Sequence, residues 1–241
     1  MKKIFFLIIT VVSLFLIKAN AKGFGVGKNE AGVRPNVGIK EITQNGGYTI
    51  GADDNKIYLT FDCGYENGYT EHILDTLKKT DTKACFFITG HYLDKSSDIV
   101  RRMIDEGHII GNHTNKHKAM PNISNEEIIE DVTSLEKKFY EKFNIAMSKF
   151  VRPPKGEYDG RSIKLLSDNG YTPIFWSLAY VDWYKDKFNG NHYSYNHVID
   201  RIHNGAIILM HTVGKDNMVD LEDVIIKLKD MGYVFSSLEE L

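Results

Sequence analysis

From residue 56 to the C-terminus, short and continuously apolar segments alternate with segments whose apolar residues recur every three or four positions. Continuous apolar runs are typical of strands buried on both faces, and the longer spacing is typical of amphipathic helices. About seven such alternations predict an α/β fold with parallel strands, in a barrel or in an open doubly wound sheet. The expected strands are 57–61, 84–88, 108–110, 150–151, 174–176, 206–210 and 233–235.

The helical segments carry recognisable ends. Ser124, followed three residues later by Glu127, predicts a capping box at the start of one helix. Gly170, Gly205 and Gly232 follow helical runs, where a C-terminal cap is expected. No G-x-G-x-x-G or P-loop follows a strand, so a nucleotide-binding protein is not favoured. The expected helices are 69–79, 96–106, 124–139, 161–167, 197–203 and 221–229.

The N-terminus predicts export. Two lysines precede an apolar stretch at 4–17, and an Ala-Asn-Ala sequence follows at 19–21. This arrangement predicts a secretory signal peptide over residues 1–21, cleaved after Ala21. An uncleaved anchor is the alternative, although the apolar stretch is shorter than the roughly 20 residues that span a bilayer. We therefore expect a protein of the cell envelope or the extracellular space.

The remainder divides into two parts. Residues 22–55 are rich in Gly and Asn and lack periodicity, so we expect an extension that wraps the catalytic domain at 56–241. The net charge of −2 gives no reason to expect a nucleic acid partner. Nothing implies a protein partner, and a monomer is expected. The two cysteines, Cys63 and Cys85, exclude a disulfide-stapled scaffold but leave one bridge open.

Five segments end an apolar run with chemically capable residues. Polar side chains at the carboxyl ends of parallel strands gather at one rim of a barrel, so the five segments predict a single active site. These segments are Phe-Asp-Cys-Gly at 61–64, the pair His113 and His117 after the run 108–111, Arg-Pro-Pro-Lys-Gly at 152–156, Asp-Trp at 182–183 and Leu-Met-His at 209–211.

A metal site is the first candidate chemistry. His113 and His117 have the spacing of one helical turn, and imidazoles so placed can bind one divalent metal. The spacing alone is weak, because the chain contains nine histidines. Cys63 is a candidate third ligand, and simple packing is the equal alternative. One thiolate and two imidazoles suit Zn²⁺, with a fourth position left for water.

Asp62 and Arg152 are candidate catalytic residues. A carboxylate at the end of a buried strand is costly unless it is paired or used, and Asp62 is a candidate base beside a metal-bound water. Arg152 precedes two prolines that restrict its backbone, and its guanidinium can clamp Asp62. A structural salt bridge is the alternative for both. The first free amide after the prolines belongs to Lys155, which is a candidate oxyanion donor.

His211 is a candidate general acid, with a structural core histidine as the alternative. A neighbouring carboxylate would raise its pKa, and Asp182 is the candidate. Trp176 and Trp183 are candidate walls for a sugar ring, although such residues more often belong to a core.

Five segments resemble, in their order along the chain, the five motifs of polysaccharide deacetylases. They are Thr-Phe-Asp-Cys-Gly at 60–64, His-Thr-Asn-Lys-His at 113–117, Arg-Pro-Pro-Lys-Gly at 152–156, Asp182-Trp183 and Leu-Met-His at 209–211. This is the NodB-homology group, carbohydrate esterase family 4. The resemblance extends from about Lys56 to the C-terminus. Segments 64–67 and 175–183 are similar to the spore-cortex branch, which deacetylates N-acetylmuramic acid on the way to muramic δ-lactam.

The resemblance implies a distorted (β/α) barrel with fewer than eight strands and a metal-dependent hydrolase of amide C–N bonds in N-acetylated glycans. The implied roles are Asp62 as base, Arg152 as the residue that holds it, His211 as acid tuned by Asp182, His113 and His117 as metal ligands, Thr114 as a brace between them, and Leu209 as lining for the acetyl methyl group.

Two positions depart from the family pattern. Cys63 replaces a metal-binding aspartate, as a non-Asp residue often does in the cortex branch, and Lys155 replaces a frequent tyrosine.

The expected substrate is therefore peptidoglycan, most specifically N-acetylmuramic acid of spore cortex, and the expected location extends to the forespore intermembrane space. Lys155 or Arg161 could attract the lactyl carboxylate of muramic acid. One alternative is N-acetylglucosamine deacetylation in peptidoglycan or chitin. Another is an inactive glycan-binding homologue, which the presence of Cys63 makes plausible. An unrelated metal amidohydrolase usually has an H-x-H after its first strand, which this chain lacks.

Overall fold

The computed structural model describes residues 21–241. The predicted signal peptide, apart from Ala21, lies outside the described residues. Among the helices of residues 21–241, none is long and apolar enough to cross a membrane.

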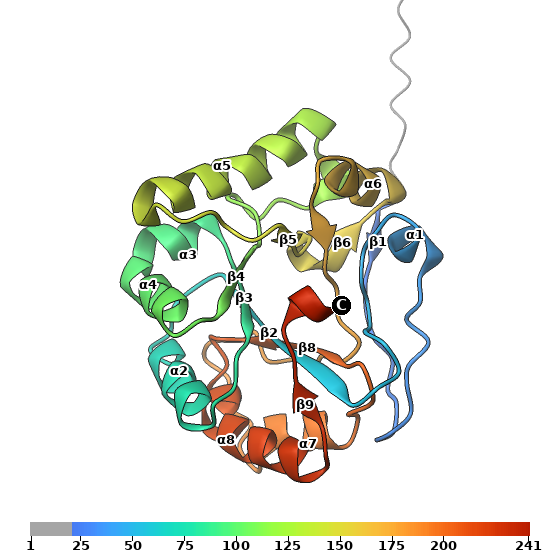
Figure 1. Cartoon of the computed structure of the whole chain (residues 1–241), viewed down its shortest axis with the longest axis vertical. Coiled ribbons are helices and arrows are strands. Elements are labelled where there is room, and N and C mark those ends of the chain that lie inside the picture. Colours follow the sequence, from blue (N-terminus) through green and yellow to red (C-terminus); the bar gives the residue numbers. More distant parts are fainter. Residues whose placement is uncertain (1–20) are drawn as a thin grey trace, which may run out of the picture.

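A curled parallel sheet forms the centre of the molecule, and helices surround it on the outside (Figure 1). Its order is β7-β5-β4-β3-β2-β8, and β9 pairs with the first residues of β2. The arrangement is a half-barrel of seven parallel strands, as the alternating pattern predicts. The strands are β2 (Lys56–Cys63), β3 (Cys85–Ile88), β4 (Ile109–Asn112), β5 (Phe150–Val151), β7 (Thr172–Pro173), β8 (Ile207–His211) and β9 (Val234–Phe235).

The helices largely follow the predicted segments. α1 and α3 are additions, α7 begins and ends earlier than expected, and α8 begins before Leu221. The capping box at Ser124 is present: its hydroxyl accepts from the Glu127 N–H, and the Glu127 carboxylate accepts from the Ser124 N–H. The helices are α1 (Lys40–Thr43), α2 (Thr70–Lys79), α3 (Gly90–Lys95), α4 (Ser97–Asp105), α5 (Asn125–Phe143), α6 (Gly160–Asp168), α7 (Tyr193–Ile199) and α8 (Lys215–Asp230), with 3₁₀ turns η1 (Met120–Asn122), η2 (Pro154–Gly156) and η3 (Leu238–Glu240).

The glycine predictions have two outcomes. Gly170 and Gly232 follow α6 and α8 with φ of 79° and 86°, as helix C-terminal caps require. The prediction for Gly205 is wrong, because α7 ends well before it. A Cβ at Gly205 would lie 2.2 Å from the carbonyl oxygen of Ala52, so this glycine permits close approach of two backbone segments.

One predicted strand is displaced. The run 174–176 was expected to be a strand, whereas β7 ends at Pro173. The carbonyls of Ile174 and Phe175 accept hydrogen bonds from the Arg152 guanidinium. These carbonyls therefore bind a side chain inside the barrel instead of extending the sheet.

The two faces of β2 separate the core from the site. Leu59, Phe61 and Cys63 belong to the hydrophobic cluster that includes α2 and α8. The alternate residues, including Tyr58 and Asp62, point to the barrel interior, because successive side chains of a strand face opposite sides. A polar residue at the end of β2 therefore reaches the barrel mouth without entering the helix-facing core.

The cysteines illustrate the same alternation. Cys85 pairs in register with Thr60 and belongs to the inner cluster, whereas Cys63 belongs to the helix-facing cluster. Both are buried free thiols. The bridge that the sequence left open is not formed, because the two side chains lie on opposite faces of the sheet.

Residues 22–55 lie against the open side of the half-barrel (Figure 1). The Tyr48 N–H donates to the carbonyl of Pro173 at one sheet edge, and the Gly51 N–H donates to that of Gly205 just before β8 at the other edge. β1 (Lys22–Gly23) pairs with β6 (Glu157–Tyr158). The segment thus connects the two edges that the short sheet leaves apart.

We expect Gly111→Ala to destabilise the protein by about 1–3 kcal/mol, the usual cost of overpacking a core. Gly111 lies beside Phe87 across the β3–β4 pair, and a Cβ there would lie 2.5 Å from the Phe87 ring. The free energy of unfolding in urea measures the effect. Gly38→Ala is the control, because a Cβ at that position meets no atom within 4 Å. Equal stability of the two variants would contradict this packing.

Candidate active site

A cavity of about 510 Å³ opens at the carboxyl ends of β2, β4 and β8. Polar side chains from three strand ends and two loops meet there, as the common-rim hypothesis predicts. The polar lining consists of Asp62, His113, His117, Lys155 and His211, and the apolar lining includes Phe24, Tyr65, Trp176, Trp183, Leu209 and Val213.

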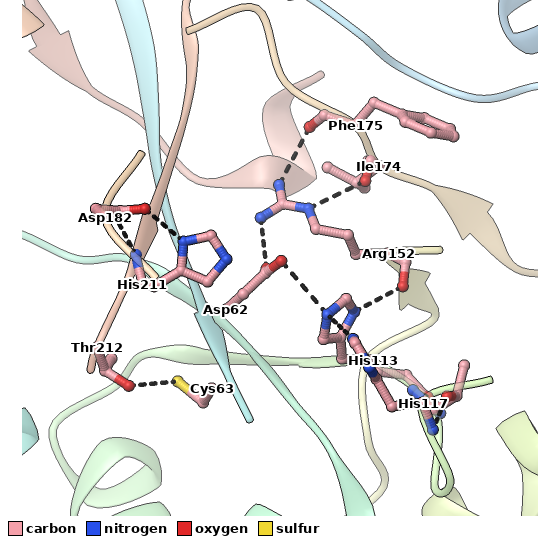
Figure 2. Close-up of polar contacts among 12 residues, drawn as sticks. Asp62, Cys63, His113, His117, Arg152, Ile174, Phe175, Asp182, His211 and Thr212 are labelled. Atoms are coloured by element: carbon pink, nitrogen blue, oxygen red, sulfur yellow. Dashed lines mark hydrogen bonds and ion pairs between the residues drawn. The ribbon is translucent and has the colours of Figure 1, made fainter. Parts of the chain in front are cut away.

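Asp62 is held from behind by Arg152. The fully buried guanidinium donates from Nη1 to Asp62 Oδ1 at 2.9 Å (Figure 2). Its other groups donate to the carbonyls of Ile174 at 3.2 Å and Phe175 at 3.1 Å, and its face lies 4.1 Å from the centre of the Phe87 ring. Arg152 does not itself line the cavity. Its role in the geometry is to fix the carboxylate.

This pairing keeps Asp62 ionised. Burial opposes ionisation, but the surrounding groups, among them the permanently charged Arg152 guanidinium that donates to this carboxylate, outweigh it and hold the pKa of Asp62 below its ordinary value. Asp62 Oδ2, the oxygen not bonded to Arg152, lies 3.4 Å from His113 Nε2. An ionised carboxylate oxygen therefore lies beside the histidine pair.

The histidine pair has the geometry of two ligands to one ion. His113 Nδ1 donates to the carbonyl of Arg152 at 2.8 Å, which fixes the tautomer and leaves Nε2 with a free lone pair. His113 Nε2 and His117 Nε2 are 3.1 Å apart. Two nitrogens that bind one Zn²⁺ at the usual Zn–N length, with an N–Zn–N angle of roughly 90–110°, lie about 2.9–3.4 Å from each other.

Both imidazoles are neutral, as metal ligands must be. Burial lowers the pKa of His113, and burial together with His113 lowers the pKa of His117 to about 4. Among residues 21–241, no group of three or more His, Cys, Asp or Glu side chains has the arrangement of a complete metal site. The described residues therefore fit a cation held by two imidazoles beside a carboxylate, with positions left for water or substrate.

The pair is not built on a helix, although its spacing is that of a helical turn. Residues 113–119 form a loop, in which Thr114 and His117 have positive φ of 65° and 53°. The Thr114 hydroxyl accepts from the His117 N–H at 3.0 Å, so Thr114 does brace the loop between the two histidines. The loop is what turns the two rings toward each other.

The expectation that Cys63 is a third ligand is corrected by its position. The side chain is fully buried on the helix-facing side of β2, where its sulfur accepts a hydrogen bond from the Thr212 hydroxyl (Figure 2). Burial raises the pKa of this thiol well above its ordinary value. Strand alternation is the cause, because neighbours in a strand face opposite sides and Asp62 takes the cavity side.

His211 and Asp182 form a second polar pair. His211 Nδ1 lies 2.7 Å from Asp182 Oδ1, and the His211 N–H donates to Asp182 Oδ2 at 2.8 Å. Burial opposes a charge on His211, but Asp182 outweighs it and raises the pKa of His211 above its ordinary value. The Nδ1 is occupied by the carboxylate, so Nε2 is the nitrogen free to face the cavity.

The residues predicted to contact substrate also lie at the cavity. Lys155, Trp176, Trp183 and Leu209 line it, and Lys155 and Trp183 are exposed. Arg161 does not line the cavity, because its guanidinium donates to the backbone carbonyls of Met120, Pro121 and Ile123.

Three lining residues were not predicted from the sequence: Phe24, Tyr65 and Val213. Phe24 comes from the N-terminal segment, and its ring lies 5.3 Å from that of Trp176, edge to face. An isolated phenylalanine in a Gly-rich stretch carries no periodic pattern, so its position at the cavity could not be predicted from the sequence. Tyr65 lies next to the 60–64 motif, which is the one indication that was available.

Known proteins share both the sequence pattern and the fold. A family model described as polysaccharide deacetylase matches residues 19–174. The chain is 40% identical over 194 residues to the Bacillus subtilis peptidoglycan-N-acetylmuramic acid deacetylase PdaA, covering 80% of this chain and 74% of that protein. It is 32% identical over 211 residues to a Bacillus cereus peptidoglycan-N-acetylglucosamine deacetylase, covering 84% of this chain and 96% of that protein.

The structural comparison agrees. The solved structure of Bacillus subtilis PdaA, a family 4 carbohydrate esterase, matches with a TM-score of 0.88 at 36% identity, over 92% of this chain and 97% of that one. The family model spans well over half of the sequence and includes the first three of the five motifs, and together with these relatives it confirms the resemblance to the family. The chain belongs to the polysaccharide deacetylases of carbohydrate esterase family 4, hydrolases that act on amide C–N bonds.

Proposed function

We propose that this protein removes the acetyl group from N-acetylmuramic acid in peptidoglycan, in spore cortex on the route to muramic δ-lactam. The observation that carries the proposal is the convergence of an ionised carboxylate, two neutral imidazoles and a carboxylate-paired histidine on one cavity. The choice of sugar is supported by the 40% identity to a relative that is named for this activity.

A divalent metal fits the histidine pair, and Zn²⁺, which imidazole nitrogens bind readily, is the ion that we propose. His113 and His117 would hold it. When bound, such an ion would supply Lewis acidity toward the acetamide carbonyl and an attacking water. Cys63 takes no part in holding it.

The residues of the chain then supply the proton transfers. Asp62 accepts a proton from the attacking water through Oδ2, the oxygen that Arg152 leaves free. Pro153 and Pro154 carry no N–H, so the Lys155 N–H is the first amide available to the oxyanion. His211 gives its proton from Nε2 to the amine as the C–N bond breaks, which releases acetate and the free amino sugar.

The walls of the cavity fit a glycan. Trp176 and Trp183 present aromatic surface to a sugar ring, and Leu209 presents apolar surface to the acetyl methyl group. Lys155 is the exposed cation at this cavity and would attract the lactyl carboxylate that distinguishes muramic acid from glucosamine. With Arg161 engaged elsewhere, Lys155 is the residue to which we assign this preference.

Export is part of the proposal. The signal peptide predicted at 1–21 would deliver the protein to the cell envelope, where peptidoglycan is found, and to the forespore intermembrane space for a cortex substrate. No protein partner is required by the reaction, and we propose a monomer.

Mass spectrometry of peptide-free peptidoglycan strands, incubated with the protein and defined metals, tests the proposal directly. A loss of acetyl groups from muramic acid residues is the expected result. Loss from glucosamine residues instead would favour the activity for which the Bacillus cereus relative is named. No loss from either sugar would favour a glycan-binding homologue without activity.

We expect Asp62→Asn and His211→Ala each to lower kcat by about two or more orders of magnitude, the usual scale for removing an acid or a base. Acetate release from the glycan measures the effect, and thermal unfolding checks that each variant is folded. Near wild-type acetate release in either variant would remove that residue from the mechanism.

We expect Lys155→Ala to reduce kcat/KM more on muramic substrates than on glucosamine substrates, because only muramic acid carries the lactyl carboxylate. Lys164→Ala is the control, since Lys164 pairs with Asp168 on the surface of α6. An equal loss on both sugars would show that Lys155 does not select between them.

We expect His113→Ala to weaken Zn²⁺ binding by at least about tenfold, and Cys63→Ala to leave it unchanged, because the histidine faces the cavity and the cysteine faces the core. Isothermal titration calorimetry of each folded variant measures the affinity without reference to activity. Weakened binding in Cys63→Ala would restore the cysteine as a ligand.

A further inference from the structure

A buried amide lies directly behind the His211–Asp182 pair. Asn217, on α8, is fully buried and does not line the cavity. Its Nδ2 donates to Asp182 Oδ2 at 2.6 Å and to the carbonyl oxygen of His211 at 2.9 Å. One side chain thus holds both members of the pair, from a helix that has no other part in the proposed reaction.

The opposite end of the same amide is also engaged. Asn217 Oδ1 accepts from the Tyr180 hydroxyl at 2.7 Å and from the Ser194 hydroxyl at 2.7 Å. A primary amide has two donor hydrogens and two acceptor lone pairs, and all four are used here. A carboxylate and a carbonyl can only accept, so the orientation of the amide is determined by its neighbours.

Asp182 needs this support because no regular element fixes it. It lies in an irregular segment between β7 and α7, outside the ladders of the sheet. Its Oδ1 faces His211, whereas its Oδ2 is held by the His211 N–H and by Asn217. Asn217 is therefore the one side chain other than His211 that donates to this carboxylate in the described part of the chain.

The chain between β8 and α8 is shaped to bring this amide into place. A Cβ at Gly214 would lie 2.7 Å from the carbonyl oxygen of Asp182 and 3.2 Å from Asn217 Nδ2. A side chain there would push the backbone at Asp182 away from the Asn217 amide that holds the Asp182 carboxylate. The turn before α8 and the position of Asn217 are thus parts of one arrangement.

We propose that Asn217 is a positioning residue, which holds Asp182 in the orientation that pairs it with His211 Nδ1 and so directs the His211 Nε2 proton to the departing amine. The proposal rests on the acid role proposed for His211. Three charged groups face that imidazole: Asp182, Asp62 and Arg152. Of these, Asp182 is the one whose orientation Asn217 controls.

The consequence concerns the chemical step and not substrate binding. Without the amide, the Asp182 carboxylate keeps only its contacts to His211 and is free to rotate away from Nδ1. The imidazole then loses both its fixed direction and the anion that favours its protonated form. Asn217 does not touch the cavity, so KM has no reason to change.

The experiment is a double-mutant cycle with Asn217→Ala and Asp182→Asn, assayed on whichever glycan the wild-type protein deacetylates. In the wild-type background we expect Asn217→Ala to lower kcat by on the order of tenfold to a hundredfold, with KM unchanged. The alkaline limb of the pH profile should move to lower pH, because His211 loses the carboxylate that favours its charge. In the Asp182→Asn background the same change should alter kcat by less than about twofold.

The matched control is Asn196→Ala on α7, an exposed asparagine whose amide donates to the carbonyl of Asn191, away from the pair. It should retain the wild-type kcat. If Asn217→Ala does not fold, Tyr180→Phe serves in its place, because it releases the amide at its other end. A loss of about threefold that disappears in the Asp182→Asn background is then expected.

An unchanged kcat in folded Asn217→Ala, or an equal loss in both backgrounds, would overturn the positioning role. A wild-type rate in His211→Ala would overturn the acid role and this proposal together. A defect in His211→Ala without one in Asn217→Ala would overturn this proposal alone.

Discussion

The buried ion pair between Arg152 and Asp62 is the interaction on which the active site depends. A guanidinium with no exposed surface is costly unless every donor is satisfied, and here its donors go to one carboxylate and to two backbone carbonyls. Those two carbonyls belong to Ile174 and Phe175, which leave the sheet to meet it. The arginine therefore fixes the Asp62 carboxylate, organises the segment that carries Trp176, and connects through its own carbonyl to His113.

The same cavity holds two titratable groups whose pKa values are shifted in opposite directions. Asp62 is held in its ionised form beside the histidine pair. Asp182 raises the pKa of His211, which favours the protonated form of that imidazole. These opposite shifts arise from different partners, a cation behind one group and an anion behind the other. A base and an acid can then face the same cavity at the same pH, which is the requirement for cleaving an amide.

The N-terminal segment also contributes to function. It connects the two edges of a half-barrel and places Phe24 against Trp176 in the wall of the cavity. Gly156 makes this contact possible, since a Cβ there would lie 2.7 Å from the Trp176 ring. At the other end of the barrel, Leu238 and Leu241 of the C-terminal turn pack with Tyr58 in the inner cluster. Both ends of the described chain thus complete a barrel that the strands alone leave open.

Much of the fold and of the site could be predicted from the sequence, because both depend on local patterns. Alternating apolar runs and helical periodicity predicted the parallel α/β fold, and the ordered motifs predicted which polar residues meet at its rim. Three features of the site could not be predicted from the motifs. Strand alternation directed Cys63 into the core and Asp62 to the cavity, although they are neighbours in sequence. Phe24 and Asn217 reach the site from segments without a motif, and positive φ angles at Thr114 and His117 turn the imidazoles together. The sequence by itself determined the chemistry available; the tertiary structure decided which side chains face the cavity, because direction is set by the whole barrel and not by neighbours in the chain.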